Sequence, residues 1–157
     1  VYKHFSSKEI LFKLITQEVW TQAINASALE YDSQVDIRTQ LIHIANKELK
    51  LFRTKRYIDI SRMLFAEHML SKELTEEAFG EYQMDQSGVT LWIKAAMKDK
   101  KLIRASPDFV GKQFVSLLKG FAFWPQIILR KPPISKKESE GIVKSTVEMF
   151  LKQYGKI

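Results

Sequence analysis

Apolar residues recur every three or four positions along almost the whole chain, from Leu11 to Tyr154. This spacing places them on one face of an α-helix, whereas a half-buried strand requires strict alternation. No stretch combines sustained alternation with the turn residues of a hairpin. The pattern therefore predicts an all-α protein of about six helices with essentially no sheet.

Capping signals mark the helix starts. Ser6 with Glu9, and Ser135 with Glu138, have the Ser-x-x-Glu spacing of a capping box, in which the two side chains satisfy free backbone groups. Ser106 is followed by a proline, which is favoured at the first helical position. The predicted helices span residues 6–27, 36–53, 54–69, 71–100 with a bend near Gly88, 106–129 with a kink at Pro125, and 135–155 after the Pro132-Pro133 connector.

The last two predicted helices carry more apolar surface than one contact can cover. Segment 109–128 is apolar almost all round, and a helix of that kind must be buried on two sides. Pairing with a second copy of the chain about a twofold axis is the commonest way to cover such a surface, and an internal hairpin is the alternative. The residues predicted at the dimer interface are Phe121, Trp124, Ile128, Val143, Val147, Phe150 and Tyr154.

The composition excludes cysteine chemistry and argues against a membrane protein. The chain has 157 residues and no cysteine, which excludes disulfides, thiolate ligands and cysteine nucleophiles. No apolar run reaches the roughly 18 residues that a membrane span needs, and the first eleven residues lack the apolar centre of a signal peptide. We expect a cytoplasmic protein without a membrane segment. Because it begins with Val1, we expect a piece of a longer protein.

The net charge of +7 is distributed in alternating blocks. Segment 66–85 is acidic, and segment 94–104 is basic. Alternation of this kind is typical of solvated helix faces rather than of one nucleic-acid groove. The basic surplus by itself indicates only an affinity for anionic partners.

No catalytic constellation is present in the sequence. His4, His43 and His68 lie far apart and have no metal-ligand spacing. The acidic cluster around Glu76 has no apolar flank that would raise the pKa of a carboxyl for acid–base chemistry. We therefore predict no enzyme, no metal and no cofactor.

The start of the chain resembles a family signature. Residues 1–11, VYKHFSSKEIL, contain the pattern Tyr-x-His-Phe-x-x-Lys-Glu-x-Leu. In the TetR family of bacterial repressors this pattern closes the DNA-reading helix and opens the next helix. Segments 62–67 and 102–118 are similar to the AefR-like branch of that family. The matching residues are Tyr2, His4, Phe5, Lys8, Glu9 and Leu11.

The resemblance implies three parts. Residues 1–5 would end the recognition helix of the helix-turn-helix, 6–27 would form a connecting helix, and 28–157 would form the ligand-binding and dimerisation domain. The first helices of the headpiece are absent from this sequence, so operator DNA would be bound by the full-length protein. A lysine near a helix start lies beside free backbone N–H groups and suits a phosphate. The predicted DNA contacts are Tyr2, Lys3, His4 and Lys8, with ordinary packing as the alternative for Tyr2 and His4.

A small hydrophobic or aromatic effector is the expected ligand, because large rings and a few polar groups cluster in the middle of the chain. By moving the connecting helix, such an effector would control the spacing of the headpieces in a homodimeric repressor. Plain core packing is the alternative for most of these rings. A protein-interaction adaptor and a carrier of hydrophobic ligands are the alternative functions. The predicted pocket residues are Trp20, Phe65, His68, Met69, Phe79, Tyr82, Trp92, Phe114 and Phe121.

Overall fold

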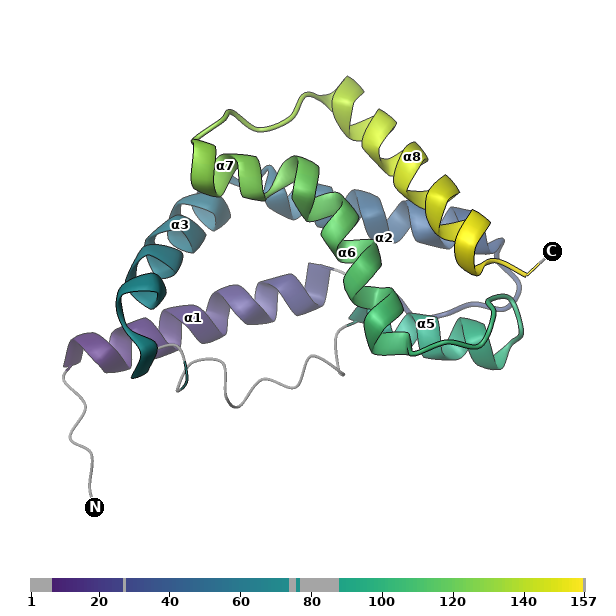
Figure 1. Cartoon of the computed structure of the whole chain (residues 1–157), viewed down its shortest axis with the longest axis horizontal. Coiled ribbons are helices and arrows are strands. Elements are labelled where there is room, and N and C mark those ends of the chain that lie inside the picture. Colours follow the sequence, from purple (N-terminus) through teal and green to yellow (C-terminus); the bar gives the residue numbers. More distant parts are fainter. Residues whose placement is uncertain (1–6, 27, 74–75, 77–87, 157) are drawn as a thin grey trace, which may run out of the picture.

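The computed structural model describes residues 7–26, 28–73, 76 and 88–156, and these form an all-α fold (Figure 1). The only bridge of β type within them joins Leu102 to Gly155. The predicted fold class is therefore confirmed. The described helices are α1 (Ser7–Ala26), α2 (Ile37–Phe52), α3 (Lys55–Leu70), α5 (Gly88–Lys98), α6 (Pro107–Ala122), α7 (Trp124–Leu129) and α8 (Lys136–Tyr154).

The helices begin where capping residues predict. Ser106 accepts a hydrogen bond from the backbone N–H of Phe109, with Pro107 in the first turn of α6. The capping box of α8 is complete, since Ser135 and Glu138 each accept from the backbone of the other. The capping box predicted at Ser6 lies outside the described residues.

The predicted helix 106–129 is divided into two helices before Pro125, and a left-handed residue ends the second one. The helix was predicted to kink at Pro125, and α6 in fact ends at Ala122, with Pro125 in the first turn of α7. Proline fits there because the first N–H groups of a helix have no partner within the helix. Arg130 then adopts a φ of 51° and ends α7. The bend predicted near Gly88 involves residues before α5 that lie outside the described ranges.

The core is built around α2, which packs against α1, α3, α6 and α8. Its buried apolar face is the one that the helical spacing predicts. The indole of Trp92, on α5, is fully buried, and its Nε1 donates to Gln40 Oε1 at 3.0 Å. The buried residues of this face are Leu41, Ile44, Ala45, Leu49 and Phe52.

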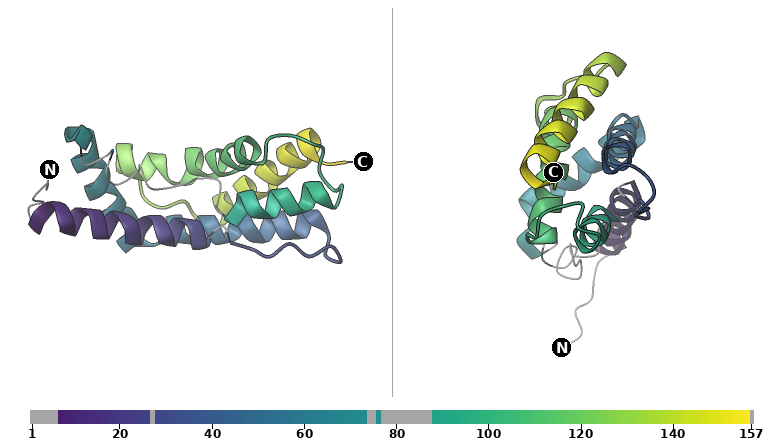
Figure 2. Two further views of the ribbon diagram at one scale, coloured as in Figure 1. Left: turned by 90° about the horizontal axis from the view of Figure 1, so that it is seen from below. Right: turned by 90° about the vertical axis from the view of Figure 1, so that its right-hand side faces the viewer.

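The start of α1 and the end of α8 lie at opposite ends of the molecule, and backbone hydrogen bonds fix the end of α8. α1 runs along one long side and begins at the end opposite the last turn of α8 (Figure 2). At the other end, the backbone N–H of Ile103 donates to Tyr154 O at 2.8 Å, and that of Lys156 donates to Lys101 O at 3.0 Å. The segment after α8 is thereby joined to the loop between α5 and α6.

The structure corrects the interface prediction for α8. Val143, Val147 and Phe150 are 5%, 0% and 3% exposed in a single chain, because α8 packs against α2 and α6. The rings of Phe150 and Phe114 meet edge to face at 5.2 Å. These three residues therefore belong to the core of one subunit and have almost no surface to offer a second one.

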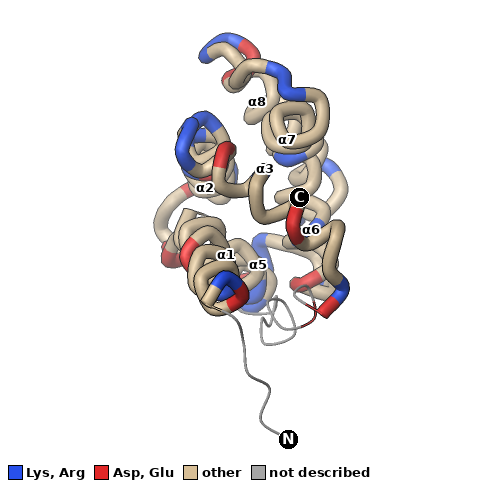
Figure 3. Tube along the Cα trace, turned by 90° about the vertical axis from the view of Figure 1, so that its left-hand side faces the viewer, with Lys and Arg blue, Asp and Glu red and all other residues tan. Residues whose placement is uncertain are grey.

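The other predicted interface residues remain at the surface. Phe121 is 60% exposed and Ile128 is 70% exposed, with Trp124 and Leu129 exposed beside them. Tyr154 is half-buried at the end of α8. Charged residues of both signs are interspersed along the helices in Figure 3.

Candidate ligand-binding site

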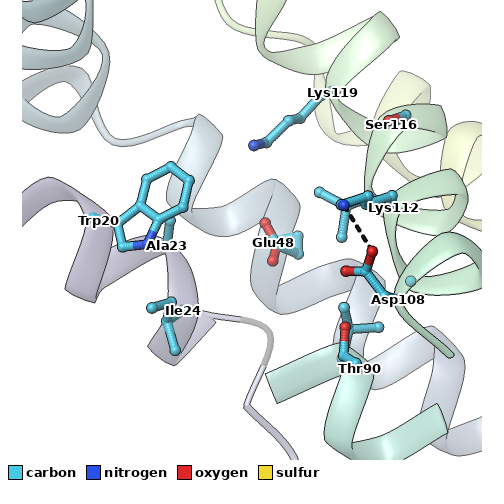
Figure 4. Close-up of a pocket in the computed structure, with 12 residues that line it drawn as sticks. Trp20, Ala23, Ile24, Glu48, Thr90, Asp108, Lys112, Ser116 and Lys119 are labelled. Atoms are coloured by element: carbon cyan, nitrogen blue, oxygen red, sulfur yellow. Dashed lines mark hydrogen bonds and ion pairs between the residues drawn. The ribbon is translucent and has the colours of Figure 1, made fainter. Parts of the chain in front are cut away.

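A cavity of about 140 Å³ lies between α1 and α6, and we call it the α1–α6 cavity (Figure 4). Four helices contribute to its wall. The lining is apolar for the most part, with charged groups from α2 and α6. Its residues are Trp20, Ala23 and Ile24 from α1, Glu48 from α2, Val89 and Thr90 from α5, and Asp108, Gly111, Lys112, Val115, Ser116 and Lys119 from α6.

A second cavity of about 60 Å³, the α1–α3 cavity, lies beside the first. Trp20, Ala23 and Lys119 line both, so the two spaces adjoin at these residues. Helix α1 thus supplies a wall to each cavity. The other residues of the α1–α3 cavity are Thr16, Val19, Tyr57, Ser61, Leu64, Phe65, His68 and Phe123.

Helical spacing places the cavity-lining residues of α1 on one face of the helix. Thr16, Trp20 and Ala23 follow at four and three positions, which places them on one side of the helix. Thr16 is 2% exposed, whereas Leu11 and Leu14 in the first half of α1 are 56% and 57% exposed. The part of α1 from Thr16 onward is therefore the part that contacts the cavities.

Two groups of opposite charge, Glu48 from α2 and Lys119 from α6, line the α1–α6 cavity (Figure 4). Glu48 is 3% exposed on α2, and Lys119 is partly buried on α6. Burial lowers the pKa of Lys119, because a low-dielectric environment disfavours the ammonium, and the Glu48 carboxylate raises it by less. Lys119 Nζ also lies 5.6 Å from the centroid of the Phe123 ring.

A second pair of charges on α6 forms an ion pair through one carboxylate oxygen, whereas the other oxygen, Asp108 Oδ1, is buried without a described hydrogen-bond partner. Lys112 Nζ lies 2.7 Å from the Asp108 carboxylate, one turn earlier on the same helix. This pair is at the more exposed part of the cavity wall, since the Lys112 side chain is 51% exposed. It adds no net charge to the site.

The size of the site limits the ligand. An engineered protein cavity of about 150 Å³ holds a benzene molecule. The α1–α6 cavity, at about 140 Å³, is of that size. The arrangement therefore suits one aromatic ring or a short chain, with a polar group near Lys119.

Three of the pocket residues predicted from sequence lie at these cavities, namely Trp20, Phe65 and His68. Phe79 and Tyr82 lie outside the described residues. Contact of any of these residues with a ligand remains a prediction.

Four predicted pocket residues line neither cavity. Met69 is 85% exposed near the end of α3, and Phe121 is 60% exposed near the end of α6. Trp92 and Phe114 are 1% and 0% exposed in the close-packed core. Large rings at helical spacing fill a core as readily as they line a pocket, which is why the sequence pattern does not distinguish Trp92 and Phe114 from pocket residues.

The sequence analysis missed Glu48 and Lys119. Both carried a detectable signal, since Glu48 lies three residues after Ala45 and one before Leu49 on the apolar face of α2. Lys119 lies within an apolar run that continues to Phe123. A charged residue on a buried helix face must find a partner or a cavity, because burial of an unpaired charge is costly.

The fold and the cavities can now be compared with known proteins. A sequence profile for the C-terminal domain of AefR-like transcriptional repressors matches residues 39–156. A solved structure, a TetR family transcriptional regulator from Pseudomonas syringae pv. tomato str. DC3000, is similar with a TM-score of 0.83 and 30% identity, over 98% of this chain and 77% of that one. The chain belongs to the TetR family of transcriptional regulators. No curated protein matches it significantly.

The DNA contacts predicted for this TetR-family chain are untested. Tyr2, Lys3 and His4 lie outside the described residues. Lys8 is exposed on the first turn of α1, and its Nζ lies 3.7 Å from the Glu67 carboxylate of α3. Its contact with a phosphate therefore remains a prediction.

In the part of this TetR-family chain that the structure describes, no three His, Asp or Glu side chains gather in a way that would hold a metal ion. None of the helices described is long and apolar enough to cross a membrane.

Proposed function

We propose that this TetR-family chain is the effector-sensing and dimerising part of a ligand-responsive repressor, with residues 28–157 as the sensor and α1 as the connecting helix. The observation that carries the proposal is that α1 lines both cavities through Trp20 and Ala23. A ligand held there contacts α1 and the body at the same time. It therefore favours whichever position of α1 gives it the better contacts.

The position of α1 matters because of what TetR-family regulators do. They bind DNA as dimers, and dimeric helix-turn-helix proteins hold their recognition helices about 34–36 Å apart to enter successive major grooves. A swing of α1 changes this spacing and weakens DNA binding. Ordinary allosteric coupling is about 1–3 kcal/mol, or about 5-fold to 150-fold in affinity, which is sufficient for partial release of operator DNA.

We assign dimerisation to the exposed apolar face on α6 and α7. Phe121, Trp124 and Ile128 follow one another at helical spacing and are 60%, 37% and 70% exposed in a single chain. An apolar face of this kind is typical of a surface that a second subunit covers. A twofold axis through it would place the two α1 helices in equivalent positions.

The movement of α1 can be measured directly because the sequence has no cysteine. A spin label on Lys13→Cys reports the distance between the two α1 helices of a dimer, and a label on Lys137→Cys reports on α8 as the control. We expect saturating small aromatic compounds to change the first distance and leave the second unchanged. Binding without a change in either distance would overturn the proposal and favour a carrier of hydrophobic ligands.

A further inference from the structure

Lys119 is the group at which the two cavities meet. It lines both, and within the described residues no acceptor lies within hydrogen-bond distance of its Nζ and no carboxylate lies within 4.0 Å. A lysine ammonium has three donors and no acceptor. The ammonium lies over the Phe123 ring, with the ring centroid 5.6 Å from Nζ.

The remaining charges of the site do not supply the missing acceptor. Asp108 Oδ2 binds Lys112 Nζ at 2.7 Å, and its buried Oδ1 makes no described hydrogen bond to Lys119 or to another group. Glu48 acts on Lys119 only through space, across the cavity, and takes part in other interactions of its own. The negative charge of Glu48 nevertheless helps to keep Lys119 in its ammonium form.

We propose that the effector is a small aromatic carboxylic acid, whose carboxylate binds Lys119 and whose single ring lies in the α1–α6 cavity. This inference rests on the proposed function and adds the chemical class of the ligand. Charge-assisted hydrogen bonds between an ammonium and a carboxylate are about twice as strong as neutral ones. A buried ammonium without an acceptor gains more from such a partner than a solvated one does.

The walls of the α1–α6 cavity explain the aromatic part of the ligand. Trp20 and Ile24 of α1 line one side of the cavity (Figure 4), and Val89 of α5 and Val115 of α6 add apolar side chains to its lining. The volume of about 140 Å³ matches one ring. The α1–α3 cavity, at about 60 Å³, is too small for a ring and can hold only the polar end.

The test compares three ligands of nearly equal shape and different charge: benzoate, benzamide and benzylammonium. Calorimetric titration of the 157-residue chain is expected to give the tightest binding for benzoate. Lys119→Met removes the charge at similar length, and we expect it to weaken benzoate by roughly tenfold to a hundredfold while benzamide is unchanged. Lys144→Met removes the same charge from an exposed position on α8 that lines neither cavity, so it is the matched control and should bind benzoate like the wild type.

Each other outcome has a defined meaning. Preferred binding of benzylammonium would show that Glu48 governs the site and would overturn the inference. Equal binding of benzoate and benzamide, unaffected by Lys119→Met, would also overturn it and leave the sensor function standing. If no aromatic compound of any charge binds, the sensor function fails as well. A thermal melt of Lys119→Met checks the fold, which loss of a buried ammonium should not destabilise.

Discussion

The Thr16 hydroxyl of α1 lies 3.2 Å from His68 Nε2 of α3. The hydroxyl hydrogen is donated to Phe12 O at 2.8 Å, so the oxygen is left to accept from the ring. This assigns the ring hydrogen of neutral His68 to Nε2. The bond joins α1 to α3 at the wall of the α1–α3 cavity.

Acid is expected to destabilise the fold through His68. Burial lowers the pKa of His68 below 6.5, so the unfolded chain takes up a proton more readily than the folded one. The free energy of unfolding therefore falls as the pH drops through 6.5 towards the lower pKa of the folded state. Thermal melts of His68→Gln between about pH 5 and 7.5 should show a weaker dependence on pH than the wild type. The exposed His43→Gln is the control and should keep the wild-type slope.

Gly111 marks the closest approach of α5 to α6. A Cβ added there would lie 2.9 Å from Thr90 Oγ1, and Thr90 is 2% exposed. We expect Gly111→Ala to lower the free energy of unfolding by about 1–3 kcal/mol, since overpacking shifts a buried β-branched side chain.

The matched control for Gly111 is Gly141 on α8. A Cβ at Gly141 meets no atom within 4 Å. Gly141→Ala is expected to stabilise the fold by about 0.5–1 kcal/mol, because alanine has the higher helix propensity. Urea titrations measure both, and a stabilised Gly111→Ala would contradict the close approach.

Gln40 joins a loop to two helices. Its Oε1 accepts from Trp92 Nε1 at 3.0 Å and from Asp32 N at 3.0 Å, and its Nε2 donates to Asp32 O and Val35 O, both at 2.8 Å. Gln40→Leu keeps the volume but leaves the buried indole N–H unsatisfied, at a cost of about 1–3 kcal/mol. Chemical denaturation with tryptophan fluorescence measures the loss. Exposed Gln34→Leu should change stability by less than about 0.5 kcal/mol.

Dimerisation and core packing are expected to respond to different substitutions. Ile128→Glu places a charge on the exposed face and should convert a dimer into a monomer of nearly wild-type stability, since Ile128 is 70% exposed. Val147→Ala removes buried methyl groups and should cost about 1–3 kcal/mol while leaving the dimer intact. Light scattering and thermal melts separate the two effects. A dimer that survives Ile128→Glu would exclude this face as the interface.

Helix boundaries could be predicted from the sequence because they depend on capping residues within a few positions of each helix end. The cap at Ser106 and the capping box of Ser135 act within four residues, and both occur as predicted. The division at Pro125 was placed within a few residues for the same reason.

The sequence did not predict which helices cover each apolar face, because periodicity identifies an apolar face but not what packs against it. The face of α8 around Val147 is covered by α2 and α6 of the same chain. Trp92 and Trp20 look alike in sequence, yet one is in the core and the other at a cavity. That difference depends on how distant helices are placed, which a single sequence does not encode in any short pattern.

The backbone bonds from Ile103 to Tyr154 and from Lys156 to Lys101 close the body at the end remote from the start of α1. Under the proposed function, in which α1 moves and this end is held by backbone bonds, a fluorescent or enzymatic reporter attached after α8 would not follow the movement. It would report the assembly and the total amount of the protein but would not respond to the effector. A biosensor made from this protein should therefore carry its reporting group on the exposed half of α1.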